Sequence, residues 1–76
     1  MDAGNILAAL GGKENVEYLD SCITRLRITV RDLEKVNERS LKKEGAVGIV
    51  KLGGGNIQVI LGTEAELIEQ DIKDLM

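Results

Sequence analysis

The sequence predicts an α+β fold, a two-layer sandwich in which three helices cover one face of a four-stranded antiparallel sheet. Short segments with strand-like alternation are separated by segments with helical spacing of apolar residues. The connections within each pair of strands are short enough for hairpins, which favours antiparallel pairing. The resulting order is helix, two strands, helix, two strands, helix. We expect residues 1–76 to form a single domain.

The first element is predicted to be a helix that begins after Asp2. A carboxylate in that position caps a helix, because it accepts a hydrogen bond from a free N–H group of the first turn. Gly11 and Gly12 are expected to end the helix, and a polar loop follows as far as Asn15. The apolar residues at helical spacing are Ile6, Leu7 and Leu10.

Two predicted strands follow. The first begins at Val16 and runs to about Asp20, and strand periodicity places Val16, Tyr18 and Asp20 on one face. The segment Ser21–Thr24 lacks the Asn-Gly or Asp-Gly pair typical of tight hairpins, so we expect a loop wider than a two-residue turn. The second strand is expected to run from Arg25 to about Arg31, and its alternating pattern predicts one buried and one exposed face. On the face expected to be buried lie Leu26, Ile28 and Val30. On the face expected to be exposed lie Arg25, Arg27, Thr29 and Arg31.

A second helix is predicted from Asp32, as its cap, to about Glu44. Its apolar stripe is imperfect, and Ser40 is expected to cap a second turn of helix. Gly45 is expected to end this helix.

The last third of the chain predicts a hairpin and a helix. The strands are expected at Val47–Leu52 and Ile57–Leu61, with a glycine-rich turn at Gly53–Asn56. Thr63 and Glu66 have the spacing of a capping box, which predicts the start of the last helix there. The buried stripe of this helix is expected to contain Leu67, Ile68, Ile72 and Leu75.

Composition excludes several classes of function. The chain has no histidine and one cysteine, so it contains no Cys-His pair and no Cys-rich zinc site. We expect neither a metal nor a cofactor. The net charge of -3 and the single aromatic residue argue against a nucleic-acid-binding protein. The lone cysteine suits a reducing compartment, and the helix-like apolar stretch Ile6–Leu10 is too short to cross a bilayer, so we expect a cytoplasmic location.

The segment around Cys22 concentrates the chemistry of the chain. The nucleophilic form of cysteine is the thiolate, which nearby cations stabilise. Arg25 and Arg27 are two residues apart in a predicted strand, so both point to one face beside the connection that carries Cys22. Guanidinium groups stay protonated and bind phosphate oxygens through paired hydrogen bonds. A thiol beside two such groups favours phosphoryl transfer onto sulfur.

The stretch Cys-Ile-Thr-Arg-Leu-Arg at residues 22–27 resembles the phosphorylation motif of enzyme IIB domains in the glucose family of the bacterial phosphoenolpyruvate-dependent sugar phosphotransferase system. The similarity covers nearly the whole chain, because further segments resemble family segments in the family's order. These segments are residues 7–12, 19–22, 42–48 and 57–62.

This resemblance implies a phosphoryl carrier. Cys22 would accept a phosphoryl group from a phosphohistidine of the IIA component and pass it to a sugar that crosses the membrane through the IIC component. Arg25 and Arg27 would hold the phosphoryl group or steer partner surfaces. The domain would therefore work at the inner face of the cell membrane, associated with it through IIC.

Three further residues belong to the candidate site, and the resemblance implies two of them. In the family, the aspartate before the cysteine and the glutamine of the last strand lie near the active site, and the matching residues here are Asp20 and Gln58. We expect Asp20 to have a positioning role. Thr24 belongs to the motif and follows Cys22 by two residues.

Three alternatives remain open at this stage. Cys22 could be an inert buried thiol, since free cysteine is among the most buried residue types. The chain could be a cysteine phosphatase. Such enzymes, however, have more residues between the cysteine and the arginine than this chain has, where two residues separate Cys22 from Arg25 and four separate it from Arg27. It could also be an interaction or regulatory module that kept the fold and lost the chemistry.

Overall fold

The chain folds into three α-helices and four strands in the predicted order, and the computed structural model describes all residues from 1 to 76. The strands form one antiparallel sheet, so the predicted α+β class is confirmed. Short 3-10 helices occupy three connections, at Lys13–Asn15, Leu33–Lys35 and Gly62–Glu64. The main elements are α1 (Ala3–Ala9), β1 (Val16–Cys22), β2 (Arg25–Val30), α2 (Glu38–Lys43), β3 (Gly48–Gly53), β4 (Asn56–Ile60) and α3 (Ala65–Leu75).

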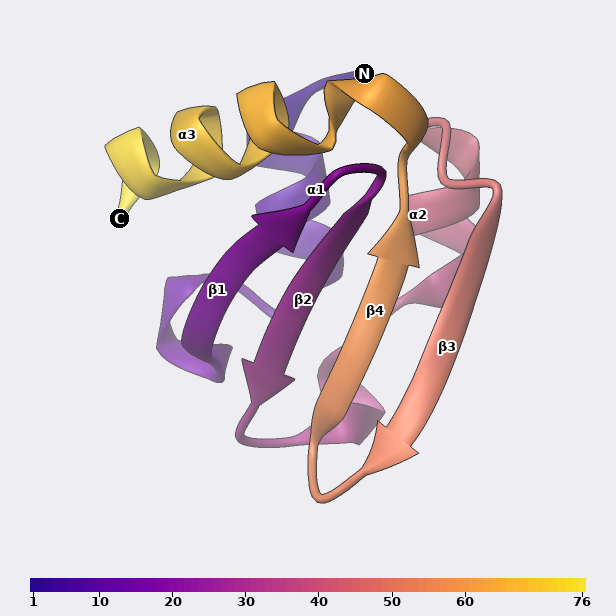
Figure 1. Ribbon diagram of the computed structural model, residues 1–76. Helices are drawn as coiled ribbons and strands as arrows, with labels where there is room; N and C mark the ends of the chain where they lie inside the picture. The colour runs from indigo at the N-terminus through magenta and orange to yellow at the C-terminus, as the bar shows by residue number, and fades with distance from the viewer.

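The strand order β1-β2-β4-β3 places the C-terminal strand β4 beside β2, next to the hairpin that carries the cysteine. Figure 1 shows α1 and α2 behind the sheet and α3 near the end where β1 and β4 finish. The face of the sheet that is turned toward the viewer carries no helix. We call this face the open face.

The core between sheet and helices is aliphatic. Leu26, Ile28 and Val30 are buried, as their alternation in β2 predicted. On β4, Val59 pairs with Leu26 and Ile57 pairs with Ile28, and both are buried as well. The largest buried side chains from the helices are Ile6, Leu41 and Ile72. None of the helices combines the length and the apolar character needed to cross a membrane.

The first strand differs from its prediction because it contains a β-bulge. Val16 pairs with Val30 and Tyr18 pairs with Thr29, so Glu17 is an extra residue in β1. Val16 is therefore buried, whereas Tyr18 lies on the open face and is 55% exposed. The prediction that Val16, Tyr18 and Asp20 share one face was wrong for Val16, because regular alternation cannot anticipate an inserted residue.

The segment after β2 also differs from the single predicted helix. Asp32 caps only one 3-10 turn, by accepting a hydrogen bond from the backbone N–H of Glu34. The cap of α2 is Asn37, whose side-chain oxygen accepts a hydrogen bond from the N–H of Ser40. Ser40 is thus inside the first turn of α2, and the prediction that it caps a turn was wrong. Asn37 is itself a strong capping residue, and this explains the break.

The start of α3 was predicted at the wrong residue. Thr63 lies in a 3-10 turn, and α3 begins after it without a side-chain cap, so Thr63 and Glu66 form no capping box. The buried stripe of α3 is correspondingly different. Leu67 and Leu75 are 63% and 52% exposed, because they lie off the face defined by the buried residues. The buried residues are Ala65, Ile68 and Ile72.

Asn15 is the one buried polar residue, although the sequence suggested only a polar loop. Its side-chain N–H groups donate to the carbonyl oxygens of Leu10 (2.7 Å) and Asp32 (3.0 Å). Its side-chain oxygen accepts a hydrogen bond from the backbone N–H of Asp32 at 2.9 Å. Asn15 therefore joins the end of α1 to the end of β2, two segments that no backbone ladder connects.

Replacing Asn15 with alanine should lower the free energy of unfolding by about 2–4 kcal/mol, because a buried backbone group at Leu10 and partly buried ones at Asp32 lose their partners. Urea denaturation measures this loss. The control is Asn5→Ala, which removes an exposed hydrogen bond to Glu44 and should change the stability by less than about 0.5 kcal/mol. Equal effects of the two substitutions would show that Asn15 is not a structural tie.

The turn between β1 and β2 is tight. Cys22 pairs directly with Arg25, which leaves only Ile23 and Thr24 between the strands, so the prediction of a wider loop was wrong. Ile23 has φ 54° and is the only residue other than glycine with a positive φ. A β-branched residue is unfavourable there, since its Cβ is crowded by the backbone. The hairpin thus closes at the cost of local strain instead of using a glycine.

Ile23→Gly should raise the free energy of unfolding by about 0.5–1 kcal/mol, because glycine removes the strain of the positive φ. The Ile23 side chain is 84% exposed, so its loss removes little buried area. The reverse substitution serves as the control. Gly54→Ala in the β3–β4 turn, where φ is 61°, should lower the free energy of unfolding by about 1 kcal/mol. A lower stability of Ile23→Gly would contradict the assignment of strain to this turn.

Candidate functional site

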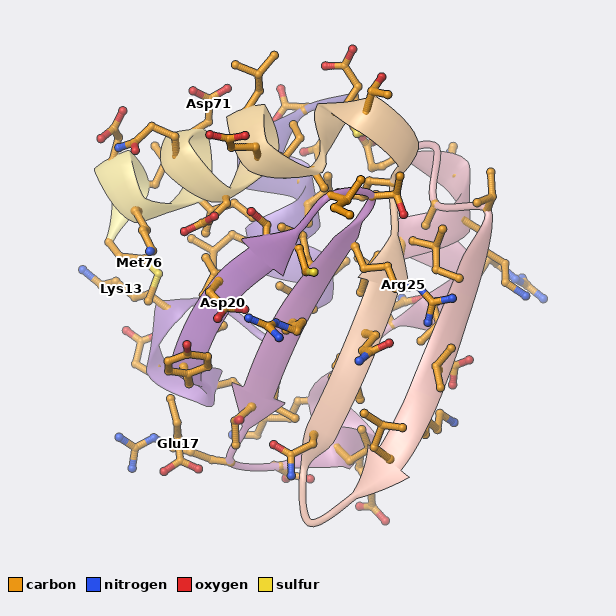
Figure 2. All side chains as sticks on the ribbon, viewed as in Figure 1. Lys13, Glu17, Asp20, Arg25, Asp71 and Met76 are labelled. Carbon is orange, nitrogen blue, oxygen red and sulfur yellow. The ribbon has the colours of Figure 1, made fainter.

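Five of the six predicted site residues lie in two neighbouring rows across the open face. In the first row Cys22 pairs with Arg25. In the second row Asp20 pairs with Arg27, and Arg27 pairs with Gln58 on β4. Directly paired residues project to the same side of a sheet. Figure 2 shows two of them, Asp20 and Arg25, on the face turned toward the viewer.

Cys22 is the last residue of β1 and is exposed, which contradicts the alternative of an inert buried thiol. It contributes to a shallow hollow of about 320 Å³ at the end of the β1–β2 hairpin. Five predicted site residues and the strained Ile23 line this hollow. They are Cys22, Ile23, Thr24, Arg25, Arg27 and Gln58.

Arg25 is held by a neutral partner. Its Nη1 donates a hydrogen bond of 2.8 Å to Oε1 of Gln58, and Arg25 forms no ion pair. Gln58 therefore orients the guanidinium without neutralising it. The positive charge of Arg25 stays available to an anion that enters the hollow beside Cys22.

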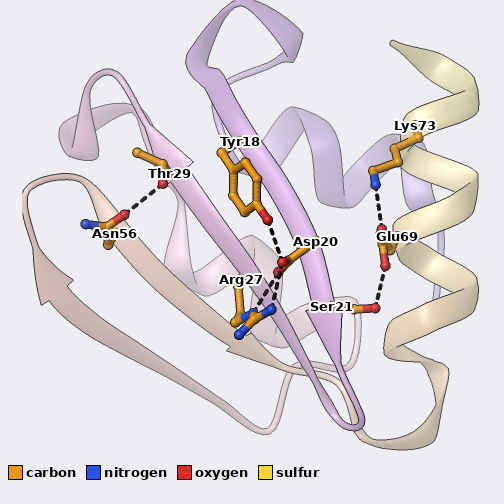
Figure 3. Close-up of polar contacts among 8 residues, drawn as sticks. All are labelled: Tyr18, Asp20, Ser21, Arg27, Thr29, Asn56, Glu69 and Lys73. Carbon is orange, nitrogen blue, oxygen red and sulfur yellow. Dashed lines mark hydrogen bonds and ion pairs between the residues drawn. The ribbon is translucent and has the colours of Figure 1, made fainter.

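Arg27 is held by a carboxylate. Its Nε and Nη2 donate to the two oxygens of Asp20, each at 2.7 Å. The same carboxylate accepts a hydrogen bond of 2.6 Å from the hydroxyl of Tyr18, so the three side chains form a chain along the open face (Figure 3). The sequence singled out Asp20 and Arg27, but Tyr18 was not predicted as part of the site.

These contacts shift the titration of the groups involved. The hydrogen bonds from Arg27 and then from Tyr18 lower the pKa of Asp20, because both favour the charged carboxylate. The hydrogen bond to Asp20 raises the pKa of Tyr18 and that of Arg27, because ionised Tyr18 or neutral Arg27 would lose it. Asp20 is thus a carboxylate, and Arg27 a cation, throughout the neutral range.

Thr24 enters the site through its backbone. Its carbonyl oxygen accepts hydrogen bonds from the N–H groups of Leu61 and Gly62, at 2.8 Å and 3.0 Å. The tip of the β1–β2 hairpin is thereby joined to the end of β4. The predicted site residue Thr24 is brought to the hollow, and this tie fixes the turn that follows Cys22.

A second tie joins the cysteine strand to α3. Ser21, the neighbour of Cys22, donates its hydroxyl hydrogen bond to Glu69, and Glu69 also pairs with Lys73 at 2.6 Å (Figure 3). The hydrogen bond from Lys73 lowers the pKa of Glu69 most, and the one from Ser21 lowers it further, because both favour the charged carboxylate. The spacing of Glu69 and Lys73 is visible in the sequence as an i, i+4 pair, but nothing in the sequence indicated that Ser21 would reach them.

The geometry combines an exposed thiol, one guanidinium free of carboxylates and a second guanidinium fixed by Asp20. Guanidinium groups are the side chains best suited to bind the oxygens of a phosphoryl group. The chain supplies no histidine that could serve as a base beside the thiol. The site can therefore bind an anionic group against sulfur, and its open position leaves room for a second protein to approach.

Comparison with known proteins agrees with this geometry. The family described as phosphotransferase system, EIIB matches residues 4–37, a range that contains Cys22, Arg25 and Arg27. The N-acetylglucosamine-specific EIIB component of Streptomyces coelicolor is 49% identical over 74 residues, which are 97% of this chain and 95% of that protein.

Longer proteins are similar too. The N-acetylglucosamine-specific EIICB component of Bacillus subtilis is 48% identical over 68 residues, and the N-acetylglucosamine-specific EIICBA component of Klebsiella pneumoniae is 47% identical over 74 residues. The matches cover 90% and 97% of this chain. The chain spans only 15% and 11% of the length of those two proteins.

A solved structure has the same fold. It is a crystal structure of one domain of the PTS system, IIabc component, from Clostridium difficile, with a TM-score of 0.68 and 25% identity over 100% of this chain and 86% of that chain. Fold, site segment and near full-length similarity to a separate EIIB component agree with the resemblance of the Cys22 segment. The chain belongs to the EIIB family of the phosphotransferase system.

Proposed function

We propose that the chain, as a single domain, is a phosphoryl carrier of the sugar phosphotransferase system and that Cys22 carries the phosphoryl group. The observation that supports this most is the position of the only cysteine. It is exposed at the end of β1 and shares a hollow with two arginines. Its thiolate would accept the group from a phosphohistidine of a IIA component and donate it to a sugar bound by a membrane-embedded IIC component.

In the first transfer the Cys22 sulfur attacks the phosphorus of the phosphohistidine. The S–P bond forms as the P–N bond breaks, and the histidine of IIA leaves with its electron pair. In the second transfer a sugar hydroxyl attacks the same phosphorus, the S–P bond breaks, and the thiolate is restored. The hydroxyl proton leaves in that step, and its acceptor is expected on the IIC side, because this chain has no histidine.

Electrostatic stabilisation is the main contribution of this chain. A phosphoryl group brings negative charge to its three outer oxygens, and catalysis of its transfer depends on positioning and neutralisation. Arg25, oriented by Gln58, and Arg27, oriented by Asp20, supply the two cations. Thr24 holds the turn through its carbonyl group, so that Cys22 and Arg25 keep their register.

The partners follow from the carrier role. Names of similar proteins combine EIIB with a C part, or with C and A parts, in one component. We propose that this chain meets a IIA partner and a IIC partner in turn through the open end of the β1–β2 hairpin. It would act in the cytoplasm at the inner face of the membrane, and IIC would select the sugar.

The test is phosphorylation by a donor cascade. The chain is incubated with a phosphoenolpyruvate-driven donor cascade that ends in a matched IIA component, and its intact mass is measured. We expect one phosphoryl adduct on the wild-type chain and none on Cys22→Ser. An unmodified wild-type chain would contradict the proposal. Cys22-dependent release of phosphate from an aryl phosphate would favour a phosphatase instead.

Arg25→Lys should slow phosphoryl transfer by about tenfold or more, because lysine keeps the charge but loses the planar pair of donors and the bond to Gln58. Rapid-quench measurement of adduct formation and of transfer to sugar checks this. Arg39→Lys is the matched control, since Arg39 is an exposed residue of α2. Equal rates for Arg25→Lys and wild type would show that charge alone suffices.

A further inference from the structure

Tyr18 is the only aromatic residue of the chain, and the structure places it outside the core. It lies on the open face, 55% exposed, although a small domain with an aliphatic core would gain stability from burying a ring. Its hydroxyl group is directed to Asp20, to which it donates a hydrogen bond of 2.6 Å. This position therefore calls for an explanation other than packing.

The β-bulge at Glu17 produces this arrangement. Val16 is buried, so regular alternation would turn Tyr18, Asp20 and Cys22 toward the core as well. The extra residue in β1 reverses the phase after Val16 and brings these three side chains to the open face. Bulges commonly redirect side chains next to active sites. Tyr18 thus owes its place to the same irregularity that exposes Cys22.

Asp20 depends on Tyr18 for one of its contacts. Its carboxylate bonds to Nε and Nη2 of Arg27 and to the hydroxyl of Tyr18. Carboxylate and guanidinium sit on the surface, where an isolated ion pair is easily broken by water. A third group that fixes one carboxylate oxygen restricts the orientation in which Asp20 meets Arg27.

The orientation of Arg27 matters for the hollow. A guanidinium has five N–H donors, and Asp20 takes two of them on the Nε side. The remaining donors form no hydrogen bond within the chain, and Arg27 lines the hollow together with Cys22. Rotation of Arg27 away from Asp20 would change where these free donors point.

We infer that Tyr18 is a positioning residue for phosphoryl transfer, which acts through Asp20 to hold the free donors of Arg27 toward the phosphoryl group on Cys22. This inference rests on the proposed function. Tyr18 itself is not among the residues that line the hollow beside Cys22. The raised pKa of Tyr18 and the lowered pKa of Asp20 agree with a strong bond between them.

The experiment compares wild type with Tyr18→Phe, which keeps the ring and removes the hydroxyl. The single-turnover rate of transfer from phosphorylated IIA, at saturating IIA, should fall about three- to tenfold, since one charge-assisted hydrogen bond is lost. The IIA concentration that gives half the maximal rate should stay unchanged. Thr29→Val is the matched control. Thr29 pairs with Tyr18 on the same face, but its hydroxyl group bonds to Asn56 and not to Asp20. The Thr29→Val chain should therefore accept the phosphoryl group at the wild-type rate.

A double-mutant cycle tests whether the effect runs through Asp20. Tyr18→Phe should have no further effect in an Asp20→Asn chain, where the carboxylate is already missing. Exchange of the Arg27 Nε proton, followed by NMR, should become faster in Tyr18→Phe.

Each outcome decides between defined alternatives. A wild-type rate for Tyr18→Phe, or an equal loss in the Asp20→Asn background, would overturn the positioning role while the carrier function stands. A wild-type chain that forms no adduct on Cys22 would overturn the carrier function and this inference with it.

Discussion

The site depends on the pairing of Cys22 with Arg25 across a two-residue turn. This register fixes which residues meet on the open face, because the pairs from Ser21 back to Tyr18 follow from it, as far as the bulge at Glu17. Asp20 then lies opposite Arg27, and β4 adds Gln58 to the same row. The turn accepts a positive φ at Ile23 to keep that register, and the carbonyl group of Thr24 is tied to the start of the segment after β4. Strain next to the thiol is thus balanced by pairing on both sides of β2.

The two arginines have different environments although they are equivalent in the sequence pattern. Gln58 holds Arg25 without neutralising it, whereas Asp20 compensates the charge of Arg27. In the proposed function, an incoming phosphoryl group would therefore meet one unpaired cation and one cation with a fixed orientation. Under the proposed carrier function, this asymmetry would attract the phosphoryl group without binding it so strongly that it could not be passed on. A shallow hollow would suit that task, since the two proposed transfers bring two different partners to the same sulfur.

Much of this could be predicted from the sequence, because it depends on local periodicity. The alternation in β2 predicted buried Leu26, Ile28 and Val30 and placed Arg25 and Arg27 on one face. The misses around the site come from irregularities that periodicity cannot encode. The bulge at Glu17 changes which residues face outward, and a positive φ at a β-branched residue gives no local signal. The ties made by Asn15, Tyr18 and Ser21 join residues distant in sequence or depend on that bulge, so they are visible only in the fold.

We propose that one cross-strand site on the open face carries the phosphoryl group. Amide chemical shifts recorded by NMR before and after phosphorylation test it most directly. We predict large changes at residues 20–27 and at Gln58, with α2, which lies behind the sheet (Figure 1), unchanged. Changes centred on any other part of the molecule, with residues 20–27 unaffected, would contradict the account.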